Sequence, residues 1–260
     1  MSVRTSTAKF LVRAGRFVQS LSVMIMRPRD LVEFNRRAYA SPQSVRGWSE
    51  DRLVDEGLSA DEKTLLGRVP LRQGKVLVLG VGGGREATEL AALGFEVTGI
   101  DFVAELAGRA AENARRRGHP IEVLAQEMSR LDVPDETFVL VWLTSGNYSS
   151  VPTRKRRLEM LGRIRRALKP GGYAVLQFLF AEEKEFSPAV EFLRRAVAWL
   201  TLGNLAYEKG DRLAGSIEYA HYFADALEAG SEFEEAGFEI VSLTAPGDTV
   251  RGGAVLRKVS

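Results

Sequence analysis

The sequence contains no cysteine, only two histidines and no long apolar run. The absence of cysteine excludes disulfide bonds, zinc sites built from thiolates and a cysteine nucleophile, and we expect no metal site. No segment approaches the ~18 consecutive apolar residues that a transmembrane helix requires. Neither sign of charge dominates, because there are 36 lysines and arginines and 34 aspartates and glutamates. The total charge is therefore too near balance to indicate a nucleic-acid partner. With an apolar fraction of 45%, these absences indicate an ordinary globular protein and fit a cytoplasmic location.

Acidic residues are also absent from residues 1–29, which carry six bases among apolar side chains. This pattern is typical of an amphipathic helix. Arg13 and Arg16 interrupt the apolar residues too early for a signal peptide. Three interpretations remain: a lid over a pocket, a helix packed on a partner element, and a weak anchor on a membrane surface. A lid or packing helix is favoured because the net charge of +6 is modest. We therefore expect residues 1–50 to form a helical segment beside the substrate pocket.

Short apolar runs alternate with segments of helical period from Val76 onward. Such alternation is typical of βαβ units and a parallel sheet. The chain of 260 residues is long enough for one α/β domain of this kind, which we expect over residues 51–260. The strands are expected at residues 76–79, 95–100, 121–124, 138–143, 173–180, 238–243 and 254–259.

Residues 181–222 are too long for a simple connection between two elements. Within them, Val190, Leu193, Val197 and Leu200 recur at helical spacing and predict a helix. We expect this insertion to cover the sheet as a substrate lid.

A glycine-rich turn, with Gly80, Gly82 and Gly84, follows the first predicted strand and precedes a helix. Because glycine has no side chain, a ligand can approach the backbone there, at the helix N-terminus. Asp101 ends the second predicted strand, 21 residues after Gly80, where a carboxylate can accept hydrogen bonds from both hydroxyls of a ribose. A tight structural turn and a helix cap are the alternative interpretations. Together the turn and the acid predict a nucleotide-like ligand, but they do not decide between NAD and S-adenosylmethionine.

The order of five segments resembles the class I S-adenosylmethionine-dependent methyltransferase family. These segments are the glycine turn at residues 80–84, Gly94 to Asp101, residues 126–138 before the fourth strand, Leu168-Lys-Pro-Gly-Gly172 before the fifth, and residues 235–240 at the closing hairpin. The resemblance implies a Rossmann-like α/β fold with helices on both faces of a seven-stranded sheet. It also implies the strand order 3-2-1-4-5-7-6 with strand 7 antiparallel.

The same resemblance implies S-adenosylmethionine as cofactor, lying across the carboxyl ends of the strands. Carried onto this sequence, the family's pattern places Gly80, Gly82 and Gly84 beside the methionine moiety and Asp101 on the ribose. It places the carboxylate of Glu127 and the backbone amide of Met128 beside the adenine. Phe102, Thr144 and Tyr148 complete the predicted cofactor-binding set.

Two positions depart from the family's pattern. Val78 stands where many members carry an acid before the first glycine, and Val139 stands where an aspartate often follows the phenylalanine of strand four. Glu86 is expected to take over the contact with the ligand's ammonium group. The alternative for Glu86 is a charge in the first helical turn that complements the helix dipole.

The resemblance implies a reaction that needs few catalytic residues, because the sulfonium of the cofactor already carries an activated methyl group. The protein then has to align acceptor, carbon and sulfur and exclude water. A base is required only where the acceptor must lose a proton, and His221 is the candidate. A histidine packed within a strand is the alternative interpretation of His221.

Residues 145–148 follow the fourth predicted strand, where the transferred methyl group should lie. They are expected either to contact the ligand or acceptor or to serve only as a turn. The run from Thr144 to Tyr148 lacks the Asp/Asn-Pro-Pro-aromatic signature of enzymes that methylate amino groups of nucleic acids. A basic helix over residues 154–169 has no interleaved aromatic residues, so a solvated helix face is favoured over a nucleic-acid surface.

The function that the sequence predicts is methyl transfer from S-adenosylmethionine to a small-molecule acceptor. Methylation of RNA or protein is a second hypothesis, for which the basic helix would be the docking surface. A non-catalytic protein that binds S-adenosylmethionine is a third, suggested by Val78 and Val139. An NAD oxidoreductase is the last. The sequence identifies neither the acceptor nor the atom methylated.

Overall fold

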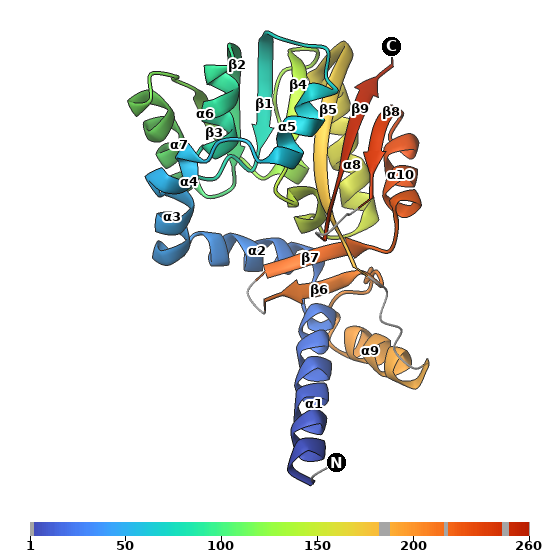
Figure 1. Ribbon diagram of the computed structural model, residues 1–260. Helices are drawn as coiled ribbons and strands as arrows, with labels where there is room; N and C mark the ends of the chain where they lie inside the picture. The colour runs from blue at the N-terminus through green and yellow to red at the C-terminus, as the bar shows by residue number, and fades with distance from the viewer. Residues whose placement is uncertain (1–2, 182–187, 216–217, 246–249, 260) are drawn as a thin grey trace.

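The computed structural model describes residues 3–181, 188–215, 218–245 and 250–259. A group of helices precedes a sheet whose strands alternate with helices (Figure 1). The N-terminal helices are α1 (Val3–Ile25), α2 (Pro28–Tyr39), α3 (Pro42–Ser49), α4 (Asp51–Asp55) and α5 (Ala60–Gly67). The alternating region comprises β1 (Gly74–Leu79), α6 (Arg85–Ala92), β2 (Phe95–Asp101), α7 (Ala104–Arg116), β3 (Glu122–Ala125), η1 (Met128–Arg130), β4 (Phe138–Leu143), η2 (Asn147–Ser150), α8 (Arg154–Ala167) and β5 (Leu168–Phe180). The remaining elements are α9 (Pro188–Leu200), β6 (Asp211–Ala214), β7 (Glu218–Phe223), α10 (Ala226–Glu235), β8 (Phe238–Thr244) and β9 (Arg251–Lys258).

The central sheet has the predicted topology. Strands β3, β2, β1, β4 and β5 are parallel neighbours in that order. Strand β9 runs antiparallel to β5, and β8 pairs with β9. With β8 and β9 as its sixth and seventh strands, the sheet confirms the order 3-2-1-4-5-7-6 with the last strand antiparallel.

The hairpin of β6 and β7 is an addition that the sequence did not predict. Its strands pair antiparallel with each other, and β7 pairs with the end of β5 only through Leu179 and Phe180. A helix within residues 181–222 is present as α9, but it packs beside α1 and not over the sheet as the expected lid. Residues 182–187 and 216–217 of that insertion lie outside the described residues.

The strands are apolar on both faces because helices cover both sides of the sheet. Along β1, Leu77 and Leu79 pack in a core that includes side chains from α8 and α10. Val76 and Val78 face the opposite way, into a second core with side chains from α5, α6 and α7. The alternation along one strand thus divides the interior into two layers, and the carboxyl ends of the strands remain available to a ligand.

Helices α1, α2 and α3 lie beyond the carboxyl ends of the strands, whereas α5 packs against a face of the sheet (Figure 1). Helix α2 packs on β7, where the amide side chain of Asn35 bonds both the N–H and the carbonyl of Tyr219 (2.6 and 3.0 Å). Helix α3 packs on α7. Helix α1 projects away from the domain, and α9 packs beside it. Residues 28–50 are therefore packed across the end of the sheet, whereas α1, the first half of the segment expected over residues 1–50, projects away from it.

Candidate functional site

The glycine-rich turn after β1 is held by the neighbouring strand. The N–H groups of Gly80 and Val81 both donate to the carbonyl of Ile100 in β2 (2.8 and 2.9 Å). Gly84 then caps α6 in the left-handed region, with φ of 96°, a conformation that favours glycine. A Cβ added at Gly82 would meet no atom within 4 Å. The turn therefore leaves bare backbone at the start of a helix.

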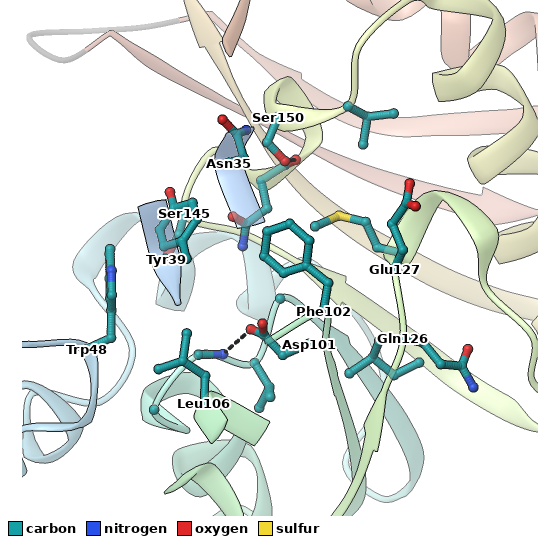
Figure 2. A pocket seen from close by; sticks show the side chains of 18 of the residues that line it. Asn35, Tyr39, Trp48, Asp101, Phe102, Leu106, Gln126, Glu127, Ser145 and Ser150 are labelled. Atoms are coloured by element: carbon teal, nitrogen blue, oxygen red, sulfur yellow. Dashed lines mark hydrogen bonds between the residues drawn. The ribbon is translucent and has the colours of Figure 1, made fainter. Parts of the chain in front are cut away.

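Asp101, at the end of β2, lies directly beside this turn (Figure 2). Its carboxylate accepts hydrogen bonds from the backbone N–H of Gly82 (3.0 Å) and of Val103 (2.9 Å). Burial raises the pKa of Asp101 above its ordinary value, although the backbone hydrogen bonds oppose this shift. Each carboxylate oxygen has two acceptor positions, so this group can accept further hydrogen bonds from a ligand.

A cavity lies between this turn, the residues after β3 and β4, and the N-terminal helices (Figure 2). It is lined by Val32, Asn35, Tyr39, Trp48, Leu53, Gly80, Val81, Gly82, Gly83, Arg85, Glu86, Ile100, Asp101, Phe102, Leu106, Gln126, Glu127, Met128, Ser129, Ser145, Asn147, Ser150, Val151 and Pro152. Segments far apart in the sequence therefore share one site.

Seven of the predicted cofactor-binding residues line this cavity. They are Gly80, Gly82, Glu86, Asp101, Phe102, Glu127 and Met128. Gly84 does not, because it sits behind the turn, where an added Cβ would lie 3.0 Å from the backbone of Ala110. Thr144 is also outside the lining: it is buried and its hydroxyl donates to the carboxylate of Glu86 (3.3 Å).

Tyr148 requires a correction, because it faces the core and not the cavity. It is fully buried, and its hydroxyl donates to the carboxylate of Glu232 (2.5 Å). Its ring packs against Phe178, Phe223 and Phe233. The short helix η2 turns this side chain inward, whereas Asn147, one residue earlier, lines the cavity.

His221 requires a second correction. It is buried in β7 and does not line the cavity. Its Nδ1 is 2.9 Å from Oδ1 of Asp211 on the paired strand β6. Asp211 also accepts a hydrogen bond from the hydroxyl of Tyr219 (2.6 Å). The structure thus places His221 within the packing of the hairpin, as the alternative interpretation proposed.

Glu86 belongs to a group of charges at the start of α6. Its carboxylate accepts from Arg85 (2.6 Å) and from the hydroxyl of Ser145 (2.9 Å). Arg85 also forms a bidentate pair with Glu62 of α5 (2.7 and 2.8 Å). Burial raises the pKa of Glu86. One arginine therefore lies between two carboxyl groups, so acids outnumber bases in this group.

Glu127 lines the cavity, but part of its carboxylate is already engaged. Its Oε1 accepts hydrogen bonds from Arg156 of α8 and from the hydroxyl of Ser129. Arg130 lies 3.7 Å from the other oxygen, Oε2. A ligand amino group would therefore have to approach Oε2.

The N-terminal helices supply cavity residues that sequence reasoning missed. Asn35 and Tyr39 come from α2, and Trp48 comes from α3. The ring of Tyr39 lies 6.2 Å from that of Trp48 and 6.3 Å from that of Phe102. Its hydroxyl donates to the carboxylate of Glu218 in β7. No local motif marks these residues; the only signal was their place in a segment expected to cover the pocket.

The fold and the cavity define a class of protein: a Rossmann-like domain whose ligand lies at the carboxyl ends of parallel strands, over a glycine turn and beside a strand-ending acid. Residues 76–172 match the methyltransferase domain family. The chain therefore contains a methyltransferase domain over these residues, within a Rossmann-like α/β fold. No curated protein sequence matches this chain.

Solved structures share the fold at low sequence identity. An S-adenosylmethionine-dependent methyltransferase from Methanosarcina mazei has a TM-score of 0.59 at 24% identity, covering 78% of this chain and 99% of its own. One from Aquifex aeolicus has a TM-score of 0.57 at 20% identity, covering 84% and 99%. The 1,6-didemethyltoxoflavin-N1-methyltransferase of Burkholderia thailandensis, solved with 1,6-didemethyltoxoflavin and S-adenosylhomocysteine, has a TM-score of 0.62 at 19% identity, covering 90% and 91%.

The residues present fit S-adenosylmethionine. The open space over Gly82 allows a ligand to approach the backbone, and the buried carboxylate of Asp101 has acceptor positions left for a ribose diol. Phe102, Leu106 and Met128 supply apolar lining beside Asp101, as an adenine requires.

Proposed function

We propose that this protein transfers the methyl group of S-adenosylmethionine to a small molecule bound between the N-terminal helices and the carboxyl ends of the strands. One observation carries this proposal: Asn35, Tyr39 and Trp48 line the same cavity as Gly82 and Asp101. Helices α2 and α3 thus cover the site and leave a bounded pocket, which suits a small acceptor better than a polymer. The Burkholderia thailandensis neighbour, which has the same fold, is a small-molecule methyltransferase.

Within this pocket, we assign the cofactor to the side lined by the glycine turn. Asp101 would accept hydrogen bonds from the ribose hydroxyls, and Gly80 and Gly82 would face the methionine moiety. Phe102 and Met128 would enclose the adenine. Glu86 would meet the ammonium group, because acids outnumber bases in the group around Arg85.

The acceptor would lie on the opposite side, against α2. There Asn35 and Tyr39 face Ser145 and Ser150, which follow β4 (Figure 2). The cofactor supplies a methyl group already activated by the sulfonium. The protein's own residues therefore have to orient the acceptor in line and exclude water, and the helices over the site serve both purposes.

His221 would act as a positioning residue for Tyr39, which lines the cavity. It joins β6 to β7 through Asp211, and β7 carries Glu218, the partner of Tyr39. A weakened hairpin would therefore shift Tyr39. This positioning role replaces the prediction that His221 removes a proton from the acceptor.

The contacts of the basic helix α8 also favour a small acceptor over RNA. Arg157 is buried against Glu232 and Glu208, and Arg156 pairs with Glu127. Arg165 donates to backbone carbonyls of the closing hairpin region. Several of these bases thus fasten neighbouring elements together, which removes them from a phosphate-binding surface.

The proposal is tested with S-adenosylmethionine that carries a deuterated methyl group. The purified protein is incubated with separate small-molecule, RNA and protein fractions of a cell extract, and each fraction is analysed by mass spectrometry. We expect the label in a small molecule, and less of it with Asp101→Ala when the cofactor is not saturating. Label confined to RNA or protein would refute the small-molecule assignment, and failure of calorimetry to detect cofactor binding would refute methyl transfer itself.

A further inference from the structure

Helices α1 and α9 form a projecting pair with many exposed apolar side chains (Figure 1). On α1, Phe10 is 68% exposed, and on α9, Phe192 is 75% and Trp199 69% exposed. The full set of exposed large apolar residues on this pair and the loop after α9 is Phe10, Leu11, Val12, Val18, Ile25, Phe192, Leu193, Trp199, Leu200, Leu202 and Leu205. A concentration of this kind marks an interaction surface, because isolated domains expose large apolar residues singly.

The pair is held firmly at its base, so these residues are presented in a fixed arrangement. The N–H of Asn204 donates to the carbonyl of Met24 (2.8 Å), and the guanidinium of Arg27 donates to the carbonyl of Leu202 (2.9 Å). A Cβ at Gly203 would lie 2.2 Å from the carbonyl oxygen of Met24, which shows how closely the two segments approach. The free ends of the helices point away from this junction.

The basic residues on α1 and α9 indicate which kind of partner this surface binds. Residues 1–29 carry six bases and no acid. Arg4 and Lys9 are exposed on α1, and Arg195 is 76% exposed on α9, between the turns that carry Phe192 and Trp199. Bases combined with phenylalanine, leucine and tryptophan are the composition of helices that lie in the interface of an anionic bilayer. A second copy of this chain would instead bring two segments of like charge together.

We propose that α1 and α9 dock together on the surface of an anionic membrane. The apolar side chains would enter the boundary between headgroups and acyl chains, and the bases would contact lipid phosphates. The docking lies along the surface: within the described residues, no helix is long and apolar enough to cross a bilayer. This proposal is independent of the identity of the methyl acceptor.

One structural consequence links the surface to the cavity. Only two residues separate the end of α1 at Ile25 from the start of α2 at Pro28, and α2 contributes Val32, Asn35 and Tyr39 to the cavity lining. Docking through α1 would therefore hold α2, and with it the wall of the cavity that α2 forms, close to the bilayer.

The test is sedimentation of the whole protein with vesicles of phosphatidylcholine alone and with vesicles that also contain phosphatidylglycerol. We expect binding only to the vesicles with phosphatidylglycerol, and we expect added salt to weaken it by screening. Phe10→Ser with Leu11→Ser, and separately Phe192→Ser with Trp199→Ser, should each reduce partitioning by at least about ten-fold. Leu227→Ser on α10 is the matched control, because Leu227 is 82% exposed away from this pair.

Two further measurements complete the experiment. Melting temperature and affinity for S-adenosylmethionine should be unchanged in these variants, since the replaced side chains are exposed and lie outside the cavity. Absence of binding to the anionic vesicles would overturn the proposal, as would α1 and α9 variants that bind as well as the unmodified protein. A dimer seen by sedimentation equilibrium and abolished by the same substitutions, without vesicle binding, would identify a second copy as the true partner.

Discussion

The backbone N–H of Gly82 donates a hydrogen bond to the carboxylate of Asp101 over 3.0 Å. This bond joins the glycine turn after β1 to the acid that ends β2. The two sequence signals for a nucleotide-like ligand are therefore in contact in the structure. Because Asp101 is buried, its charge is fixed at one edge of the cavity, and this position gives the first two predictions.

Replacement of Asp101 by alanine should weaken binding of S-adenosylmethionine by about 1 to 3 kcal/mol, the usual range for losing hydrogen bonds to a charged group. Isothermal titration calorimetry measures the change. Glu96→Ala, on the exposed side of the same strand, is the matched control and should keep the affinity of the unmodified protein. Equal affinity of Asp101→Ala and the control would disprove the ribose contact.

Cofactor binding should weaken as the pH is lowered. Burial raises the pKa of Asp101, so this carboxylate takes up its proton at a higher pH than an exposed aspartate, whose pKa is about 3.9. As the pH falls through the raised pKa, the charged acceptor is lost and affinity decreases. The measurement is the dissociation constant against pH, with Asp101→Asn as reference; a profile that Asp101→Asn leaves unaltered would assign the titration to Glu86, whose pKa burial also raises.

Gly83→Ala should disrupt the site although Gly83 has no positive φ. An added Cβ would lie 2.0 Å from the carbonyl oxygen of Trp48, so the end of α3 would have to move away from the turn. We expect a lower melting temperature and weaker cofactor binding. Gly108→Ala in α7 is the control, because its Cβ would meet no atom within 4 Å and alanine is favoured over glycine in a helix by about 1 kcal/mol.

His221→Ala should lower stability and leave cofactor affinity unchanged. The substitution removes a buried ring, leaves Asp211 without one hydrogen-bond partner, and should cost about 1 to 3 kcal/mol. Denaturant unfolding measures the loss, and the KM for the acceptor should rise through displacement of Tyr39. A fall in kcat with stability and KM both unchanged would instead restore His221 as the base.

Arg157→Met should destabilise the protein more than any other single change considered. Arg157 is buried and bonds both oxygens of the buried Glu232 (2.6 and 2.9 Å). Removal of one partner leaves an uncompensated buried charge, which costs about 3 to 5 kcal/mol. The double variant Arg157→Met, Glu232→Gln should regain part of this loss in denaturant unfolding, because it removes both charges. A loss below about 1 kcal/mol for Arg157→Met would show that the pair is screened by solvent.

Several elements of the fold were predictable because their signals are local. The apolar run before Gly80, the glycine turn and the following helical period identified β1, the turn and α6 at nearly their true bounds. The β6 and β7 hairpin was not predictable in the same way. Strand β6 is only four residues long, Asp-Arg-Leu-Ala, and shows no clear apolar run. Its backbone hydrogen bonds are made with β7 and form only when the two segments meet.

By itself, the sequence determined the order of strands and helices, the glycine turn and the acid that ends β2. These features follow from periodicity and from the backbone freedom of glycine, which act over a few residues. Only the tertiary structure decided which side chains face the cavity. It turned Tyr148 and His221 into the packing of the core and the hairpin, and it brought Asn35, Tyr39 and Trp48 over the site. The physical reason is that the direction of a side chain depends on contacts between segments far apart in the chain. A local sequence pattern does not predict those contacts.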